Sequence, residues 1–452
     1  MLGEEKLFDI LNKVLRYSKG DQTEVLLITE NSNLTRFANS YIHQNVSEQN
    51  ASLSVRVVIN KKIGSASTNL LTDESMKSAV DKATSIARLQ RENPDFKSLP
   101  ERREISKINT FFQETAECSP EKRAEDIKLI VEIANAHNLA AFGAYSTGAV
   151  ELAIANSLGI RAYSPFTDVF LNTIMKSNGA SGYANFASRD LKEIKVKQIA
   201  EEAVKKCLES ANPVDVEPGE YVTVLEEHAV SDLLLFLGYL GFGALSVQEG
   251  RSFMCNKFGE RLMGDNITIW DDGLNSESFA TAFDFEGVPK QKVTLIENGI
   301  AKNVAYDSYT AGREGKESTG HGLPAPNTHG PMPMNLFMKS GNATEEEMIA
   351  ATKRGILVTR FHYTNVVEPM KAIITGMTRD GTFLIENGKI KCAVKNLRFT
   401  ESILNALSNV SMISRKTKLA SEGTIYEKRF ATGSVVPVIK VDKFNFSGVT
   451  EF

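Results

Sequence analysis

ANPVDVEPGEY, residues 211–221, divides the chain into two parts with different secondary-structure patterns. The segment combines prolines, a glycine and acidic side chains, which interrupt regular structure. Strands and helices alternate before it, whereas strand-like stretches dominate after it. We therefore predict an α+β protein with an N-terminal mixed α/β domain over residues 1–215. A mainly antiparallel, β-rich C-terminal domain is expected over residues 216–452.

The first part shows alternating apolar residues in its strands and helical spacing between them. Serine and threonine at the helix starts can accept hydrogen bonds from the first free backbone N–H groups. Strands are expected at residues 34–44 and 51–68, and helices after Thr72, after Ser119 and over residues 189–210.

The second part contains several short alternating stretches that end in Asp-Gly or Asn-Gly turns. One helix interrupts them, because Thr344 and Glu347 can form a capping box and Gly355 can stop the helix. The expected strands cover residues 221–226, 266–272, 291–299, 355–361, 382–390 and 435–444.

Composition excludes several classes of protein. The 452 residues carry 52 Lys and Arg against 56 Asp and Glu, a net charge of −4, so nothing predicts direct binding to nucleic acid or anionic lipid. The apolar run at residues 233–245 is shorter than the roughly 20 residues of a spanning helix, and we interpret it as buried core. The start, MLGEEKLFDILNKVL, does not resemble a signal peptide. We expect a cytoplasmic protein without membrane contact, and its four widely spaced cysteines are interpreted as free thiols.

Common catalytic motifs are missing from the sequence. The six histidines form no HExxH, HExxxH or HxH pattern, and neither a GxSxG nucleophile turn nor a GxxxxGK[ST] phosphate loop occurs. Local sequence therefore points to no zinc, serine or nucleotide chemistry.

Residues 308–335 form the densest polar segment, rich in glycine and proline and without helical or strand periodicity. We predict a long loop, and loops of this length are usually functional or disordered. His321 and His329 could bind a metal with Glu314 or Glu317, but two histidines on a loop impose no geometry. The favoured interpretation is a surface loop with solvated histidines.

Asp271 and Asp272 follow a strand and form a second candidate site. Paired carboxylates can hold a cation or act as acid and base. An Asp-Asp-Gly sequence more often closes a turn, with Asp272 accepting backbone N–H bonds. The turn is the favoured interpretation.

An ordered set of segments across nearly the whole chain resembles the TldD/TldE (PmbA) family. In the second part these are EGRSFMCNKFGERL, ITIWDDG, DFEGVPKQKVTLIENGI, STGHG with PMPMN, TEEEMIAATKRGILVT and ITGMTRDGTFLIENGKI; in the first part, LTRFANSYIHQN and VRVVINKKIGSASTN. Family members are described as modulators of DNA gyrase and as zinc peptidases that act on unfolded or small peptides.

The resemblance also shows where this chain departs from the catalytic type. That type carries HExxxH on a helix early in the second domain and a late cysteine as a further ligand. On residues 229–243 here, Leu235 and Leu240 fall at the histidine positions and Phe236 at the glutamate. The late cysteine falls near Leu419-Ala420. No lone pair for zinc remains, so we expect no catalytic residue and no metal in this chain.

The resemblance therefore implies a TldE/PmbA-type subunit that is non-catalytic and pairs with a TldD-type catalytic subunit holding the zinc. Peptide substrates would enter as extended strands. The chain alone could form a homodimer. The predicted partner- or peptide-facing positions are Arg313, Ser318, Thr319, His321, His329 and Asn335.

Two alternatives stay open. The chain could be a stand-alone peptidase with an unconventional site made from His321, His329 and Asp271 or Asp272. It could instead be a regulatory protein that binds gyrase or a toxin–antitoxin partner.

Overall fold

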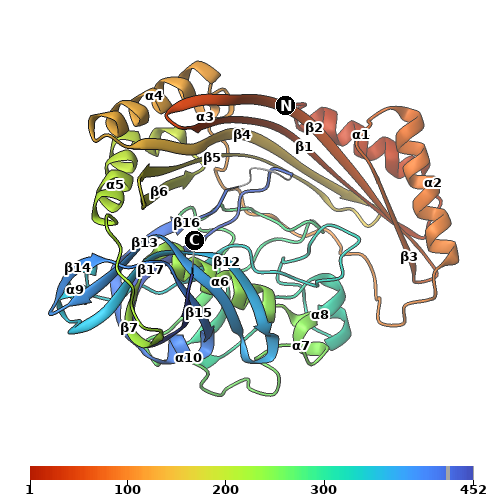
Figure 1. Cartoon of the computed structure of the whole chain (residues 1–452). Helices are drawn as coiled ribbons and strands as arrows, with labels where there is room; N and C mark the ends of the chain where they lie inside the picture. Colours follow the sequence, from red (N-terminus) through yellow and green to blue (C-terminus); the bar gives the residue numbers. More distant parts are fainter. Residues whose placement is uncertain (424–427, 451–452) are drawn as a thin grey trace.

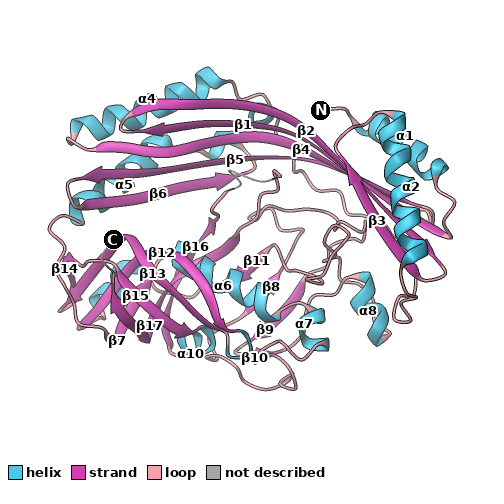
Figure 2. Cartoon of the chain, turned by 45° about the vertical axis from the view of Figure 1, so that its right-hand side comes forward, coloured by secondary structure: helices cyan, strands magenta, loops and turns pink. Residues whose placement is uncertain are grey.

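The computed structural model, which describes residues 1–423 and 428–450, places a long curved β-sheet over a second, β-rich region (Figure 1). Helices lie on the outer face of the curved sheet, and its inner face turns toward the second region (Figure 2). The predicted α+β fold class, with a mixed first part and a mainly antiparallel second part, is confirmed. The boundary near residue 216 stays a prediction.

The first sheet has six antiparallel strands in the order β3-β2-β1-β4-β5-β6. Its elements form two successive units of the same order: a helix, three strands and a helix. The first unit is α1 (Glu4–Tyr17), β1 (Gln22–Ala38), β2 (Tyr41–Ile59), β3 (Lys62–Thr68) and α2 (Asp73–Leu89). The second is α4 (Pro120–Ala136), β4 (Ala140–Asn156), β5 (Arg161–Ser177), β6 (Ala180–Ser188) and α5 (Val196–Glu209), with the short α3 (Gln113–Ala116) and η1 (Leu191–Glu193).

Successive side chains along a strand point to opposite faces of the sheet, so they belong to different hydrophobic clusters. Val25 and Leu27 on β1 belong to a cluster under α1 and α2, whereas Leu26 belongs to a cluster on the inner face. A third cluster lies under α4 and α5. Much of the sheet is therefore buried on both faces, by its own helices outside and by the second region inside, whereas the first half of β2 is exposed.

Two glycines let helices approach the edge strands of this sheet closely. A Cβ on Gly64 of β3 would lie 2.1 Å from the Ala83 carbonyl oxygen of α2. A Cβ on Gly182 of β6 would lie 2.3 Å from the Ala203 carbonyl oxygen of α5. Because both contacts are to helix backbone, each glycine occupies a position that no larger residue fits without displacing a helix.

The second region contains one eleven-stranded sheet. Its main path runs β10-β9-β8-β11-β17-β15-β13-β12-β7, and β7 also pairs with β17, which closes five strands into a ring. The strands are β7 (Gly219–Leu225), β8 (Ile269–Asp271), β9 (Val293–Glu297), β10 (Ile300–Ala301), β11 (Leu336–Met338), β12 (Arg354–Glu368), β13 (Ile373–Glu386), β14 (Lys389–Ala393), β15 (Leu397–Ser402), β16 (Val410–Ala420) and β17 (Ser434–Val449). The helices are α6 (Glu227–Gly241), α7 (Ala244–Gln248), α8 (Ser308–Glu314), α9 (Glu345–Ala350), η2 (Pro369–Lys371) and α10 (Ile403–Ser408).

The predicted helix caps are confirmed where side chains decide them. Thr72, Ser119 and Thr344 each accept a hydrogen bond from the backbone at the start of α2, α4 and α9. Two predicted ends were wrong. The helix expected from residue 189 begins at Val196, after η1, and Gly355 lies in β12 rather than at the end of α9.

A segment between β16 and β17 reaches across to the first sheet. The Arg429 guanidinium forms a double ion pair with Asp168 of β5, with Nε–Oδ1 at 2.8 Å and Nη2–Oδ2 at 2.7 Å. It also donates to the hydroxyls of Ser32 and Ser146. The Phe430 ring packs near Phe166 and Phe285. This segment therefore fastens the second region to the inner face of the sheet.

Among the described residues, no helix has both the length and the apolar composition needed to cross a membrane.

Candidate functional site

Helix α6 contains Leu235, Phe236 and Leu240, the three residues that stand where the catalytic type of the family has HExxxH. Leu240 is buried and Phe236 is partly buried, but Leu235 is 49% exposed and Tyr239, one turn later, is 56% exposed. The prediction that the whole apolar run is core was therefore wrong for one face of the helix. That face presents apolar side chains to open space.

A cavity of about 780 Å³ opens beside the C-terminal half of α6. Its wall combines the helix, the end of the polar segment and the turn after β12. The lining residues include Gly238, Tyr239, Leu240, Arg251, His329, Met332, Glu368 and Met370. A hollow of this size, mainly apolar with a few polar groups, has the character of a ligand or peptide site.

The residues around α6 do not fit a zinc ion. Zinc in proteins is held by about three nitrogen, sulfur or oxygen ligands, and the side chains of Leu235, Phe236 and Leu240 offer none. The end of β16 does lie beside the helix, because Ser231 Oγ donates to the Ala420 carbonyl oxygen at 3.4 Å. Leu419 and Ala420, the late-cysteine positions, thus lie near the helix but also lack a donor. Within residues 1–423 and 428–450, no cluster of three or more His, Cys, Asp or Glu could hold a metal.

The polar segment 308–335 is more ordered than its sequence predicts. Its first seven residues form α8, capped by Asp307, so the prediction of one continuous loop was wrong there. Beyond α8, the Nε2–H of His321 donates to Asp271 Oδ1 over 2.8 Å, and Asp271 Oδ2 accepts the backbone N–H of Asn335 at 2.7 Å. These bonds fix the segment to β8.

The predicted site residues fall into two groups. Ser318, His321 and Asn335 are buried, His321 to 1% exposure, and the Thr319 hydroxyl is hydrogen-bonded to His321 Nδ1. These three side chains are therefore covered within the chain itself, and the partner- or peptide-facing role of the segment stays a prediction. Arg313, paired with Asp95, is exposed, and so is His329, whose ring lies 6.2 Å from the Tyr239 ring.

The stand-alone peptidase site is not assembled. His321 meets Asp271, but His329 lies against Tyr239 on the other side of the segment. Asp272 closes the turn as predicted, because its Oδ1 accepts the N–H of Leu274 at 3.3 Å. The pair His321–Asp271 is fully buried, so its visible role is to hold the segment in place.

Burial lowers the pKa of His321 below 6.5, with Lys290 acting in the same direction and Asp271 opposing it. As the pH falls through about 6.5, the unfolded chain binds a proton at His321 more readily than the folded chain does. The free energy of unfolding therefore decreases on acidification. We expect His321→Gln, which cannot titrate, to shrink the drop in thermal midpoint between about pH 7.5 and pH 5.5. The exposed His137→Gln should leave that drop unchanged. An equal drop in wild type and His321→Gln would contradict the assignment.

Sequence reasoning missed Tyr239, Arg251 and Glu368, which line the cavity. The signal for Tyr239 was its spacing of four residues from Leu235, which places both on one face of a helix. Arg251 and Glu368 come from distant segments and carried no local signal.

Three regions match models of the PmbA/TldA metallopeptidase: its domain 1 at residues 23–87, its central domain at 107–210 and its C-terminal domain at 218–448. The last region alone is about half of the chain. The fold and these matches define a metallopeptidase-related protein. The chain belongs to the PmbA/TldD family, as the sequence resemblance predicted.

Individual relatives agree with this assignment. A metalloprotease TldD homologue of Buchnera aphidicola is 29% identical over 54% of this chain, and the match spans 52% of that relative's length. Metalloprotease MJ0996 of Methanocaldococcus jannaschii is 24% identical over 93% of this chain and 94% of its own. The crystal structure of TldE from Thermococcus kodakarensis superposes with a TM-score of 0.87 and 22% identity, covering 98% of this chain and 100% of that one. This last likeness shows a shared fold.

Proposed function

We propose that the chain is the non-catalytic subunit of a heteromeric, TldD/TldE-type zinc metallopeptidase that processes small or unfolded peptides. The observation that carries the proposal is the apolar filling of the ligand positions on α6, together with the donor-free Leu419 and Ala420 beside them. In this proposal the zinc and the water-activating glutamate belong to a TldD-type partner, and this chain supplies part of the chamber wall.

The surface around the α6 cavity supports a role in association. Exposed apolar side chains occur on α6, β12 and η2, the elements that border the cavity, and two of them, Tyr239 and Met370, line it. They are Leu235, Tyr239, Tyr363, Val367 and Met370. Grouped exposed apolar residues typically mark a surface that binds a protein or peptide.

Co-expression tests the proposal directly. We expect this chain, produced with a TldD-type subunit that carries HExxxH, to copurify as a complex with chelator-sensitive peptidase activity. The chain alone should hold far less than one zinc per molecule and cleave no peptide. Zinc content by metal analysis and cleavage of an unfolded peptide are the measurements.

A matched pair of variants locates the surface. Leu235→Asp places a charge on the exposed face of α6 and should weaken complex formation about tenfold or more, because the carboxylate would be desolvated on association. Leu89→Asp is the control, since Leu89 is an 89% exposed leucine on α2. A chain that fails to associate, or that cleaves peptides with its own zinc, would overturn the proposal.

A further inference from the structure

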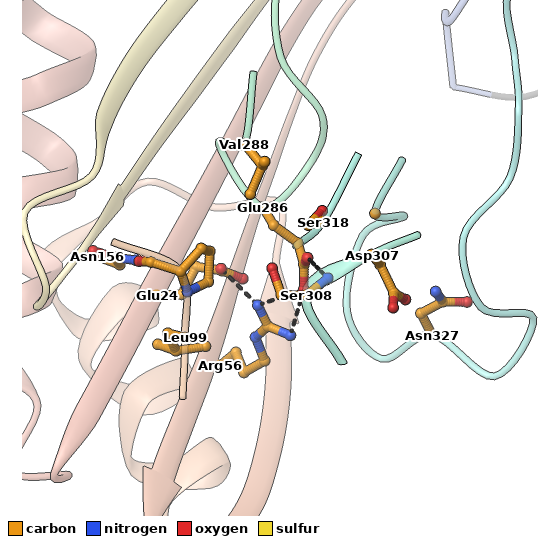
Figure 3. A network of polar contacts seen from close by, with 12 residues as sticks. Glu24, Arg56, Leu99, Asn156, Glu286, Val288, Asp307, Ser308, Ser318 and Asn327 are labelled. Atoms are coloured by element: carbon orange, nitrogen blue, oxygen red, sulfur yellow. Dashed lines mark hydrogen bonds and ion pairs between the residues drawn. The ribbon is translucent and has the colours of Figure 1, made fainter. Parts of the chain in front are cut away.

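A second cavity lies at the junction between the first sheet and the second region. Its volume is about 370 Å³, and it is separate from the hollow beside α6. One wall comes from β2, β3, α2 and the segment after α2, and the other from α7, the start of α8 and residues 323–330. The lining includes Arg56, Phe96, Leu99, Leu245, Glu286, Asp307, Ser308 and Asn327. Figure 3 shows the polar groups of this junction.

Carboxylates outnumber cations at the polar end of this cavity. Arg56 forms ion pairs with Glu24, at 2.7 Å, and with Glu286, at 3.2 Å. Asp307 lies close enough that Glu286 repels its charge. The Arg56 guanidinium therefore lies among three buried carboxyl groups, those of Glu24, Glu286 and Asp307. Burial, reinforced by Glu286, raises the pKa of Asp307, and burial also raises the pKa of Glu24.

Asp307 and Ser308 leave polar atoms unused. Asp307 is 5% exposed, and its Oδ1 accepts from the backbone N–H and hydroxyl of Thr310. Its Oδ2 accepts no hydrogen bond from any residue in the described ranges, and the carboxylate points toward Asn327 across the cavity (Figure 3). The Ser308 Oγ is buried without a partner, although its backbone N–H donates to Glu286 Oε2 at 2.9 Å. A buried hydroxyl without a partner, such as that of Ser308, is rare and calls for an explanation.

Apolar side chains also line the cavity. They are Ile63, Ile86, Phe96, Leu99 and Leu245. Pockets for small molecules have this composition: an apolar body with a few convergent polar groups, often at a domain junction and of a few hundred Å³.

We propose that this cavity binds a small organic cation, a primary amine with a short apolar body. Its ammonium group donates to Asp307 Oδ2 and Ser308 Oγ, which satisfies both unused atoms and balances the excess of carboxylates. Its apolar body packs against Phe96 and Leu99. The site is independent of the proposed subunit role, because none of these residues lies on α6.

Binding of 2-phenylethylamine to the full-length chain tests this proposal, with 2-phenylethanol as the uncharged analogue. We expect saturable binding of the amine with a dissociation constant of about 1 mM or lower, and binding of the alcohol about tenfold weaker or worse. Asp307→Asn should weaken amine binding about tenfold, since asparagine keeps the helix cap but not the charge. Isothermal titration gives the affinities, and the thermal midpoint shows that the variant is folded.

The control variant is Asp265→Asn, an exposed aspartate outside the cavity, which should bind the amine like wild type. Three outcomes would overturn the proposal. The first is no saturable amine binding, and the second is equal affinity for amine and alcohol or for wild type and Asp307→Asn. The third is Asp307-dependent binding of Mg²⁺ or Ca²⁺ alone, which would make the cavity a metal site instead.

Discussion

Replacing Arg429 with methionine lowers the free energy of unfolding by about 3–5 kcal/mol, because it leaves a buried carboxylate without its counter-ion. Arg429 is 2% exposed and Asp168 is 3% exposed, so water cannot solvate the carboxylate that remains. The substitution also removes the hydrogen bonds to Ser32 and Ser146. Chemical denaturation followed by circular dichroism measures the loss.

A double variant separates the charge effect from the packing effect. Arg429→Met combined with Asp168→Asn contains no uncompensated charge and should recover part of the lost stability. The exposed ion pair Arg103–Glu317 provides the control, and Arg103→Met should change stability by at most about 0.5 kcal/mol. If Arg429→Met behaved like Arg103→Met, the buried pair would not fasten the second region to the sheet.

Replacing Gly64 or Gly182 with alanine destabilises the first sheet by about 1–3 kcal/mol or more, because the added Cβ overlaps helix backbone. At Gly64 the clash involves the carbonyl oxygen of Ala83, and at Gly182 it involves that of Ala203. Neither helix can yield by rotating a side chain, so α2 or α5 must move as a body. The lowered denaturation midpoint of each variant is the measurement.

Gly448→Ala is the control for this prediction. Gly448 lies in β17, and an added Cβ there would meet only the Arg398 side chain at 3.9 Å, an ordinary contact. We expect its stability to stay within about 0.5 kcal/mol of wild type. Unchanged midpoints for Gly64→Ala and Gly182→Ala would show that the helices lie farther from the strands than described.

Local chemistry was readable from the sequence. Thr72, Ser119 and Thr344 cap helices because each side-chain oxygen accepts a hydrogen bond from a free backbone N–H only three residues later in the sequence. The turn at Asp272 is equally local. The start of α5 was misplaced because helical periodicity extends past the point where η1 turns the chain.

Long-range chemistry was not readable. Asp271 and His321 lie 50 residues apart, and Asp168 and Arg429 lie 261 apart, so no local pattern pairs them. The exposure of Leu235 was hidden for another reason. An apolar residue that is exposed on a helix and one that fills a core have the same sequence signal, and only the packing of neighbouring segments distinguishes them.

The inner face of the curved sheet has a consequence for biosynthesis. Leu26 and Phe166 on that face are covered by Phe283 and Phe430 of the second region. A ribosome makes the sheet first, so the nascent sheet emerges with an uncovered apolar surface and keeps it until residues near Phe430 are added. Protection by a chaperone during translation is therefore most needed in the interval between synthesis of β6 and synthesis of β17.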